Sequence, residues 1–469
     1  MTPYPALPPP TKHPDTAGKK ARLLGVDAAR GLALLGMMAV HEFSETTDTG
    51  APSTTQILFV GRSAALFAVL AGVAIAFMTG RRRVTPGPSG RAAAATLATR
   101  AGLIGLIGVV GLGWVDMEDA VAVILPAYAA MFLLAIPLVF LSTRVVLAVG
   151  AVVALVVPVG SLLVRGGLPE ASGDNISLAS FADPGGVLAE LFLTGVYPAL
   201  TWMAYLAIGL GVGRLTLSSA RVARRLLVVG AGLAVAAPLA SWLLLGPLGG
   251  TAHLLATSDL DADAITEILT LGPSGVVPAD DVWWLATAAP HSGTPLDLAA
   301  TIGSSLAVLG AMLLLGHLPA AARQVADAVQ APLVAAGSMT LTLYTAHVVY
   351  AGAFAEFDSV PEYLAQVVVL VLGAVAWRRA SDRGPLEALV GNVANRAAAA
   401  ARAGATAGPP PDDTATGPIA GLPYRPAVPP LTQPPLTGPP RPVPTLPGPR
   451  LPRDPFRPPP GTAPVSVRR

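Results

Sequence analysis

Residues 25–43, GVDAARGLALLGMMAVHEF, decide the fold because they combine the length of a membrane-spanning helix with charges at both ends. The purely apolar run, residues 31–40, is too short to cross about 30 Å of hydrocarbon, which takes about 20 residues. Asp27 and Arg30 must therefore lie within or at the edge of the span, and their spacing lets them pair on one helix face. Charges inside a span are costly, so they are functional candidates by default.

The composition favours a protein embedded in a lipid bilayer. Hydrophobic residues make up 53% of the 469 residues, charged residues only 12%, and the mean hydropathy is +0.61. A soluble protein carries roughly 25% charged residues, and a soluble Ala-rich helical protein would need polar stripes that these segments mostly lack. We therefore predict an all-α polytopic membrane helix bundle of about ten transmembrane helices. The predicted spans are residues 23–43, 56–79, 95–115, 120–141, 144–164, 187–214, 222–245, 296–317, 331–353 and 361–378.

The basic residues place both chain termini in the cytoplasm by the positive-inside rule. Arg residues gather in the loops after the second, fourth, sixth and eighth predicted spans and after the last, whereas the alternate loops are acidic. We therefore expect a multi-pass protein of the plasma membrane. Asp27 and Arg30 would lie at the cytoplasmic end of the first span and His41 at its outer end.

The chain divides into a membrane domain and two tails. Residues 1–21 are polar and Pro-rich, residues 22–403 hold the predicted spans, and residues 404–469 are Pro-rich with scattered Arg. Neither tail can bury a core, so we expect both to be disordered, the second in the cytoplasm. Pro-rich tails can bind protein modules that recognise polyproline helices, but a plain disordered extension is the simpler interpretation.

A long external loop near residues 246–295 separates the seventh and eighth predicted spans. It contains Trp283 and Trp284, which we expect to anchor at the membrane interface. The span that follows has a strong start signal, with Thr294 as N-cap and Asp297 at the third helical position of a capping box.

Four residues with useful chemistry lie at the predicted outer ends of spans. His41 ends the first span, Arg62 begins the second, His291 precedes the eighth and His347 lies in the outer part of the ninth. An imidazole suits a proton shuttle or an acyl carrier at neutral pH. Asp27 lies about 21 Å along the helix from His41 and cannot orient it directly. An ordinary interfacial histidine is the alternative interpretation of His41, as a snorkelling side chain is for Arg30.

Several kinds of site are disfavoured by what the sequence lacks. It has no Cys and no HExxH or His-x-His spacing, so we predict no metal. A P-loop, a GxSxG motif and a dinucleotide fingerprint in a suitable context are also absent. The small net charge of +2, with Arg in loops and tails, argues against nucleic acid as a partner. The glycines, such as Gly209 and Gly213 in a GxxxG pattern and the regularly spaced ones from Gly102 to Gly111, suit helix packing.

The first predicted span, VDAARGLALLGMMAVH, resembles the first-helix signature of the heparan-alpha-glucosaminide N-acetyltransferase catalytic-domain family, Asp-x-x-Arg-Gly followed by an apolar run. Related bacterial multi-spanning membrane proteins of unknown function share this signature, as do, more distantly, membrane acyltransferases that modify sugars. Other segments are similar to segments of these bacterial relatives, and the resemblance covers roughly residues 22–390. These segments are GRSAALFAVLAGVAIAF, YPALTWMAYLAIGLGVGR, HSGTP, LTLYTAH and RGPLEAL.

The resemblance implies transmembrane acyl transfer, in which an acetyl group from cytosolic acetyl-CoA reaches an amino sugar on the far side. His41 would then act as general base or transient acyl carrier, and Arg62 would help to fix the substrate or the developing oxyanion. His291 and His347 are the other catalytic candidates. The predicted binding set for the phosphates of acetyl-CoA or another acyl-CoA is Asp27, Arg30, Arg81, Arg82 and Arg83.

On this basis we predict a transmembrane acyltransferase that moves an acyl group, acetyl in the first instance, from cytosolic acyl-CoA to an envelope glycan or glycolipid. The rival interpretation is a transporter or flippase for a lipid or a small anion, which buried Arg30 and Arg62 would suit equally well. A third is a non-catalytic scaffold that recruits a protein partner through its Pro-rich tail. Besides the lipid bilayer, the sequence leaves the acceptor and the assembly open, a homodimer included.

Overall fold

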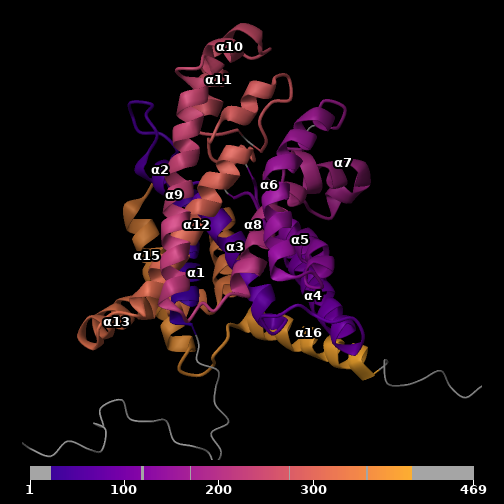
Figure 1. Ribbon diagram of the computed structural model, residues 1–469, viewed down its shortest axis with the longest axis vertical. Helices are drawn as coiled ribbons and strands as arrows, with labels where there is room; N and C mark the ends of the chain where they lie inside the picture. The colour runs from indigo at the N-terminus through magenta and orange to yellow at the C-terminus, as the bar shows by residue number, and fades with distance from the viewer. Residues whose placement is uncertain (1–22, 118–120, 170, 274, 355–357, 404–469) are drawn as a thin grey trace, which may run out of the picture. The chain divides into compact units, whose positions relative to one another are not determined.

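The computed structural model describes residues 23–117, 121–169, 171–273, 275–354 and 358–403, and in this part of the chain every named element is a helix. The two predicted tails, residues 1–21 and 404–469, lie outside the described residues. Figure 1 shows the arrangement of the labelled helices. The elements are α1 (Leu24–Glu42), α2 (Thr54–Leu58), α3 (Arg62–Met78), α4 (Pro88–Leu106), η1 (Ile107–Leu112), α5 (Leu125–Leu138), α6 (Thr143–Arg165), η2 (Ala179–Ala182), α7 (Pro184–Ala189), η3 (Glu190–Thr194), α8 (Ala199–Gly213), α9 (Ala220–Leu245), α10 (Gly250–Thr257), α11 (Ala262–Thr270), η4 (Val282–Ala286), α12 (Pro295–Leu315), α13 (Ala320–Gly337), α14 (Thr340–Phe354), α15 (Val360–Trp377) and α16 (Pro385–Ala403).

The predicted all-α polytopic class is confirmed. Among the described residues, 7 helices are long and apolar enough to cross a membrane, and counting two bent pairs as single spans raises the number to 9. The pairs are Pro184–Thr194 with Ala199–Gly213, bent by 47°, and Ala320–Gly337 with Thr340–Phe354, bent by 71°. Pro198 lies at the first bend, as expected of a kink. The remaining predicted span corresponds to α5, whose 14 residues are fewer than the about 20 that a crossing takes.

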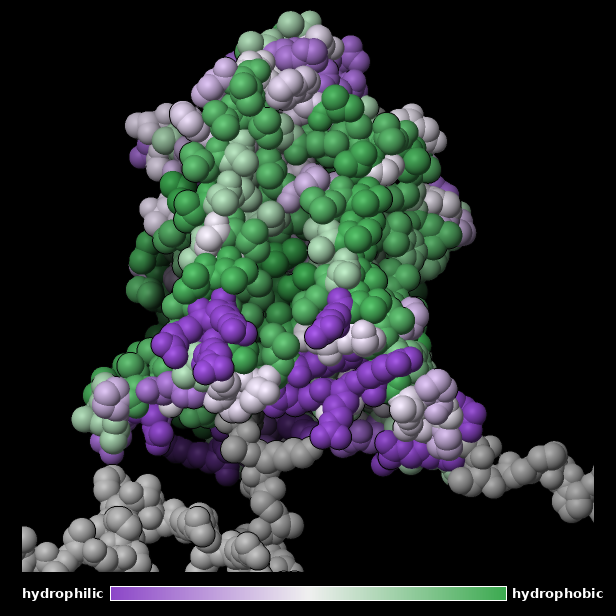
Figure 2. Space-filling view, in the orientation of Figure 1, coloured by the Kyte–Doolittle hydropathy of each residue, from purple (hydrophilic) through white to green (hydrophobic). Residues whose placement is uncertain are grey.

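The bundle has a buried centre and an apolar periphery. In α1, in α2 with α3, and in α12, more than half of the apolar window is buried, against 11% to 28% in α4, α6, α9 and α15. The peripheral helices turn large aliphatic side chains outward, among them Leu163 on α6, Val228 on α9 and Val369 on α15. Figure 2 shows hydrophobic residues over the middle of one face and hydrophilic residues gathered at its lower end. This is the pattern expected of helices that face lipid.

Glycine lets the central helices approach closely. A side chain at Gly209 of α8 would overlap the backbone carbonyl of Val69 on α3, and one at Gly213 would press on Ala76. The predicted packing role of this GxxxG pair is therefore confirmed. The glycines of α4 and η1 do not form a uniform packing stripe, because a Cβ at Gly102 would meet nothing within 4 Å.

The loop predicted to be external folds into a small lobe with a core of its own. Leu254 of α10, Ile265 of α11 and Trp284 of η4 are buried together against the end of α6. The indole N–H of Trp284 donates to Asp280 at 2.7 Å. The predicted interfacial anchoring is therefore wrong for Trp284, because the lobe itself buries this ring.

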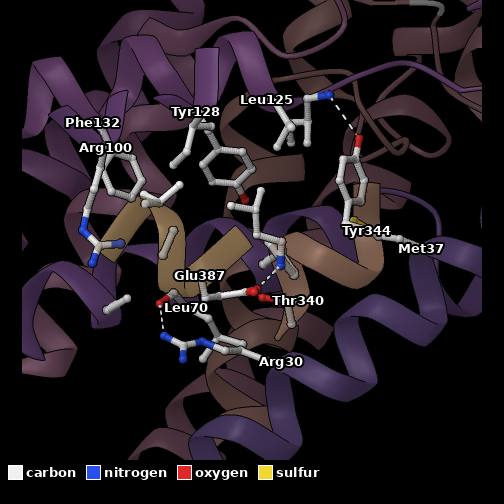
Figure 3. Close-up of a pocket in the computed structure, with 17 residues that line it drawn as sticks. Arg30, Met37, Leu70, Arg100, Leu125, Tyr128, Phe132, Thr340, Tyr344 and Glu387 are labelled. Carbon is white, nitrogen blue, oxygen red and sulfur yellow. Dashed lines mark hydrogen bonds between the residues drawn. The ribbon is translucent and has the colours of Figure 1, made fainter. Parts of the chain in front are cut away.

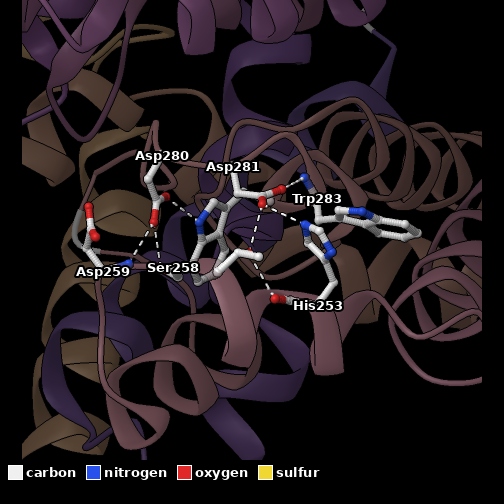
Figure 4. Close-up of polar contacts among 8 residues, drawn as sticks. His253, Ser258, Asp259, Asp280, Asp281 and Trp283 are labelled. Carbon is white, nitrogen blue, oxygen red and sulfur yellow. Dashed lines mark hydrogen bonds and ion pairs between the residues drawn. The ribbon is translucent and has the colours of Figure 1, made fainter.

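A network of exposed polar contacts stabilises the lobe. Nε2 of His253 lies 2.9 Å from a carboxylate oxygen of Asp281, and the hydroxyl of Ser258 donates to Asp280 at 2.5 Å. Figure 4 shows these contacts beside Trp283, whose ring packs against His253. The network joins α10 to the segment before η4.

Candidate functional site

Three helices bring His41, His347 and Gln366 into one hydrogen-bonded chain. Nδ1 of His41, at the end of α1, lies 3.0 Å from Nε2 of His347 on α14. Nδ1 of His347 lies 2.5 Å from Oε1 of Gln366 on α15. His347 is 1% exposed and Gln366 is 9% exposed, so the inner part of the chain is shielded from solvent. Two of the four predicted catalytic candidates are thus in direct contact.

The amide of Gln366 fixes the tautomers of both imidazoles. Its Oε1 can only accept, so Nδ1 of His347 must carry the proton that it donates. In the neutral ring Nε2 of His347 is then an acceptor, and it accepts a hydrogen bond from the N–H at Nδ1 of His41. The remaining nitrogen, Nε2 of His41, keeps its lone pair and is the basic atom of the chain.

The end of α1 that carries His41 is tied to the segment that leads into α15. The backbone N–H of Asp358 donates to the carbonyl of Glu42 at 2.7 Å. The carboxylate of Asp358 accepts from the backbone N–H of Ser44 at 2.6 Å and from its hydroxyl, and these bonds lower the pKa of Asp358. The hydroxyl of Tyr363 on α15 also donates to the carbonyl of Leu35 at 3.2 Å. These bonds hold the helix of His41 and the helix of Gln366 in one register.

His291 and Arg62 join the same end of the bundle. Gly61, which precedes Arg62 at the start of α3, packs against Pro290 and the backbone of His291. His291 is close enough to His41 for an electrostatic interaction. Its ring contacts Trp202, with ring centroids 6.4 Å apart. Three of the four predicted catalytic candidates, His41, His347 and His291, therefore lie together, which no sequence spacing could establish. The side chain of Arg62 instead lines a separate pocket between α1, α3 and α12.

His291 sits in an unusual backbone conformation. Its φ of 57° lies in the left-handed region, which residues other than glycine rarely adopt. Burial lowers the pKa of His291 to about 4, so the ring is neutral at pH 7. Its Nδ1 is buried and has no hydrogen-bond partner among the described residues. Strained residues of this kind cluster at functional sites, where the surrounding structure holds them in place.

The start of α12 positions this loop. The hydroxyl of Thr294 accepts from the backbone N–H of Asp297 at 3.1 Å, as predicted for an N-cap. The carboxylate of Asp297 reaches back to the N–H of Gly293 at 3.0 Å, one residue before the N-cap that a capping box would use. Asp297 is 3% exposed, and its electrostatic partner is Arg62. The cap therefore links the His291 loop to Arg62.

A cavity of about 210 Å³ lies among α1, α3, α4, α5, α14 and α16. Figure 3 shows its lining. Phe67, Leu70 and Phe132 are among the residues that form its apolar walls, and Arg30 and Arg100 place cations on it. A cavity of this composition suits a narrow, largely apolar ligand with an anionic end.

The predicted ion pair with Asp27 holds Arg30 at the cavity. Its guanidinium lies 3.4 Å from a carboxylate oxygen of Asp27 and donates to the carbonyl of Leu70 at 3.4 Å. Arg100 of α4 lines the cavity with it. The argument that singled out Arg30, a charge within an apolar helix, applies equally to Arg100 and could have found it.

The predicted arginine loop lies elsewhere. Arg81 donates to the carbonyl of Leu215 at 2.5 Å and Arg83 to that of Phe140 at 2.6 Å. Neither of these residues, nor exposed Arg82, lines the cavity with Arg30. The two hydrogen-bonded arginines stabilise helix ends. The cations that line the cavity are therefore Arg30 and Arg100, not Arg30 together with the predicted Arg81, Arg82 and Arg83.

Glu387, in the RGPLEAL segment, caps the helix that carries His347. Its carboxylate accepts from the backbone N–H of Leu341 at 2.6 Å and from the N–H and hydroxyl of Thr342 at 3.2 and 2.6 Å. The capped groups belong to the first turn of α14, where backbone N–H groups lack helical partners. α16 thereby fixes the start of α14.

The cavity and the histidine chain are adjacent along two helices. Met37 and Tyr344 line the cavity, and they lie one turn before His41 on α1 and before His347 on α14. One turn is about 5.4 Å. A ligand seated in the cavity would thus have its inner end next to the histidine chain. No group of three or more His, Cys, Asp or Glu side chains that could hold a metal occurs in the described ranges, and the absence of a metal stays a prediction.

Comparison with known proteins supports the resemblance. The family model for heparan-alpha-glucosaminide N-acetyltransferase, catalytic, matches residues 22–243, slightly less than half of the 469-residue chain. No curated protein matches the chain. The matched segment contains Arg30, His41, Arg62 and Arg100, whereas His347 lies beyond it. Over residues 22–243 the chain is therefore similar to the catalytic part of a family of N-acetyltransferases.

Proposed function

We propose that this protein transfers an acyl group, acetyl in the first instance, from cytosolic acyl-CoA to an acceptor on the outer face of the plasma membrane. The observation that carries the proposal is the position of the His41–His347–Gln366 chain, one helical turn beyond a cavity that Arg30 and Arg100 line. The donor side and the acceptor side would then meet at one imidazole.

The cavity suits the arm of an acyl-CoA rather than the whole molecule. Its volume of about 210 Å³ and its largely apolar walls fit a thin acyl-pantetheine chain. The nucleotide, with its phosphates, would stay at the end where Arg30 and Arg100 place positive charge. Arginine is well suited to phosphate because its planar fork donates two parallel hydrogen bonds.

Nε2 of His41 would serve as the general base. The acceptor's amine nitrogen or hydroxyl oxygen attacks the thioester carbonyl carbon while its proton passes to Nε2. The carbon–sulfur bond then breaks, and the imidazolium returns this proton to the sulfur of CoA. His347 stabilises the imidazolium through the bond that it accepts from Nδ1 of His41, and Gln366 holds His347 in the orientation that permits this.

The acceptor would approach from the side of Arg62 and His291. The partly exposed rings of neutral His291 and Tyr197 contact each other there, and aromatic rings suit the apolar face of a sugar ring. An envelope glycan or glycolipid is therefore the acceptor class that we propose. Arg62, whose electrostatic partner Asp297 belongs to the helix start after His291, would orient the acceptor or stabilise a developing negative charge.

The test is acetyl transfer in liposomes of known protein orientation. Radiolabelled acetyl-CoA is supplied on the face that carries Arg30, and glucosamine is trapped on the other side. We expect labelled glucosamine from the wild type and a loss of roughly 10²-fold or more in His41→Ala, the range for loss of a general base. His317→Ala, at an exposed histidine on the Arg-rich side, is the matched control and should retain full transfer.

Two results would contradict the proposal. A His41→Ala protein with full transfer would remove His41 from the reaction. A wild type that neither binds nor turns over any common acyl-CoA would favour transport of a lipid or a small anion instead. Label retained on wild-type protein but not on His41→Ala would identify His41 as a transient acyl carrier rather than a base.

A further inference from the structure

Tyr128 brings into the cavity a polar group that the outer histidine chain does not use. The side chain projects from α5, the residue is 4% exposed, and it lines the cavity. Its hydroxyl is buried and makes no hydrogen bond to any described residue. In Figure 3 the ring points into the cavity with the hydroxyl toward Thr340 and Glu387.

An unpartnered phenol is unusual in such a place. Buried tyrosine hydroxyls normally find a partner, because a buried polar group without one is costly. The ring itself is held in place, since it meets Phe67 edge to face with centroids 6.1 Å apart. The hydroxyl is therefore a fixed donor with no acceptor within the described protein.

The same cavity contains a second buried hydrogen-bond donor that has no partner among the described residues. Nε of Arg100 is buried without a hydrogen-bond partner among the described residues. The carboxylate of Glu387, an acceptor on the same cavity, is already engaged because it caps α14. The cavity therefore offers donors to its occupant, and the complementary ligand carries acceptor oxygens.

We propose that Tyr128 donates a hydrogen bond to the carbonyl oxygen of the acyl thioester, while Nε of Arg100 donates to an acceptor oxygen farther along the CoA arm. This rests on the proposed function, because it gives the cavity an acyl-CoA occupant. A thioester carbonyl becomes an oxyanion when its carbon is attacked, and a preorganised donor stabilises that charge. Tyr128 neither loses nor gains a proton in this step.

The surroundings of Tyr128 place it between the two halves of the site. Tyr128 is close enough to Tyr344 and Tyr197 for electrostatic interactions. Tyr344 lies one turn before His347 on α14, and the ring of Tyr197 contacts His291 with centroids 5.8 Å apart. Tyr128 thus neighbours one tyrosine on the helix of His347 and one that contacts His291.

The experiment compares two ligands that differ only at the carbonyl. Acetyl-CoA has the thioester oxygen, whereas S-ethyl-CoA lacks it. We expect purified wild type to bind acetyl-CoA about 5- to 10-fold more tightly, in line with one hydrogen bond of about 1 kcal/mol. In Tyr128→Phe this ratio should fall to about 1, and kcat for acetyl transfer should fall by roughly 10²-fold.

Tyr205→Phe is the matched control. Tyr205 is also buried, but its hydroxyl is bonded to Thr301 at 2.8 Å and it does not line the cavity. This variant should keep the wild-type ligand ratio. Tyr128→Phe loses a hydroxyl that has no partner, so it should unfold at or above the wild-type temperature. Tyr128→Leu is a second variant that also removes the hydroxyl.

The outcomes separate this inference from the proposed function. Wild type that binds neither ligand overturns both. Wild type that transfers acetyl, with an unchanged ligand ratio and unchanged kcat in Tyr128→Phe, overturns the role of Tyr128 alone. A changed ratio with unchanged kcat would also overturn the oxyanion role, since the donor would then act only in binding.

Discussion

Replacing Gln366 by Leu should invert the tautomers of the histidine chain. In the wild type the amide oxygen accepts from Nδ1 of His347, which keeps Nε2 of His41 basic. Without that acceptor, the same tautomer would leave a buried N–H unsatisfied. The inverted chain avoids this, because His347 then donates from Nε2 and His41 carries its proton on Nε2, where it cannot act as a base.

The size of the effect follows from the unsatisfied donor. A buried N–H without a partner costs about 1–3 kcal/mol, so the active tautomer would fall to a fraction of roughly one fifth to one part in 150. We therefore expect kcat/KM for acetyl transfer in Gln366→Leu to fall by about 5- to 150-fold. The Kd for acetyl-CoA should not change, because Gln366 does not line the cavity.

Gln366→Glu provides the rescue. A carboxylate at this position restores the acceptor for Nδ1 of His347, so its activity should exceed that of the Leu variant. The assay is the same liposome transfer, run with thermal unfolding of each variant in detergent. Wild-type kcat/KM in Gln366→Leu, or equal losses in the Leu and Glu variants at equal stability, would refute the tautomer argument.

Three further predictions concern stability in detergent. Glu387→Ala should lower the free energy of unfolding by about 1–2 kcal/mol, as for loss of a helix cap, and Glu387→Gln should recover part of it; equal melting temperatures for all three proteins would contradict the cap. Gly209→Val should destabilise by about 1–3 kcal/mol through overpacking against α3, whereas Gly102→Val, which faces open space, should lose less than half as much; similar losses would contradict the close approach. In the folded protein the pKa of His291 is about 4, below the reference value of about 6.5. As the pH drops, the unfolded state therefore takes up a proton on this ring before the folded state does. The free energy of unfolding should fall by about 3 kcal/mol in all between pH of about 6.5 and 4. His291→Phe should flatten that part of a thermal unfolding series, and an unchanged slope would rule out this residue as its source.

The helices could be anticipated because hydrophobicity and length report on each span independently. An apolar helix lies in every range predicted to span, within the described residues. The length of an apolar segment does not predict where a helix bends. The 71° bend between α13 and α14 depends on packing against other helices, which an apolar sequence does not encode. The burial of Trp284 could not be predicted for a similar reason. The small core that buries it forms from residues that are distant in sequence.

The residues of the candidate site also divide into those that could be predicted from the sequence and those that could not. His41, Arg62, His291 and His347 could be chosen by residue type and membrane depth, since each stands near the predicted outer end of a span. Gln366 and Tyr128 could not, because a single Gln or Tyr in an apolar helix is ordinary. They become notable only through a partner 19 residues away and through a hydroxyl that lacks one among the described residues.

The contact between His41 and His347 joins residues 306 positions apart in the chain, and this has a consequence for biosynthesis. At about 5–20 residues per second, roughly 15 to 60 s pass between translation of the first of these histidines and the second. Throughout that interval the first helix is already made while its partners are not. A chain that stops early lacks the hydrogen-bond partner of His41, so the proposed transfer would begin only after the helices of His347 and Gln366 have been inserted.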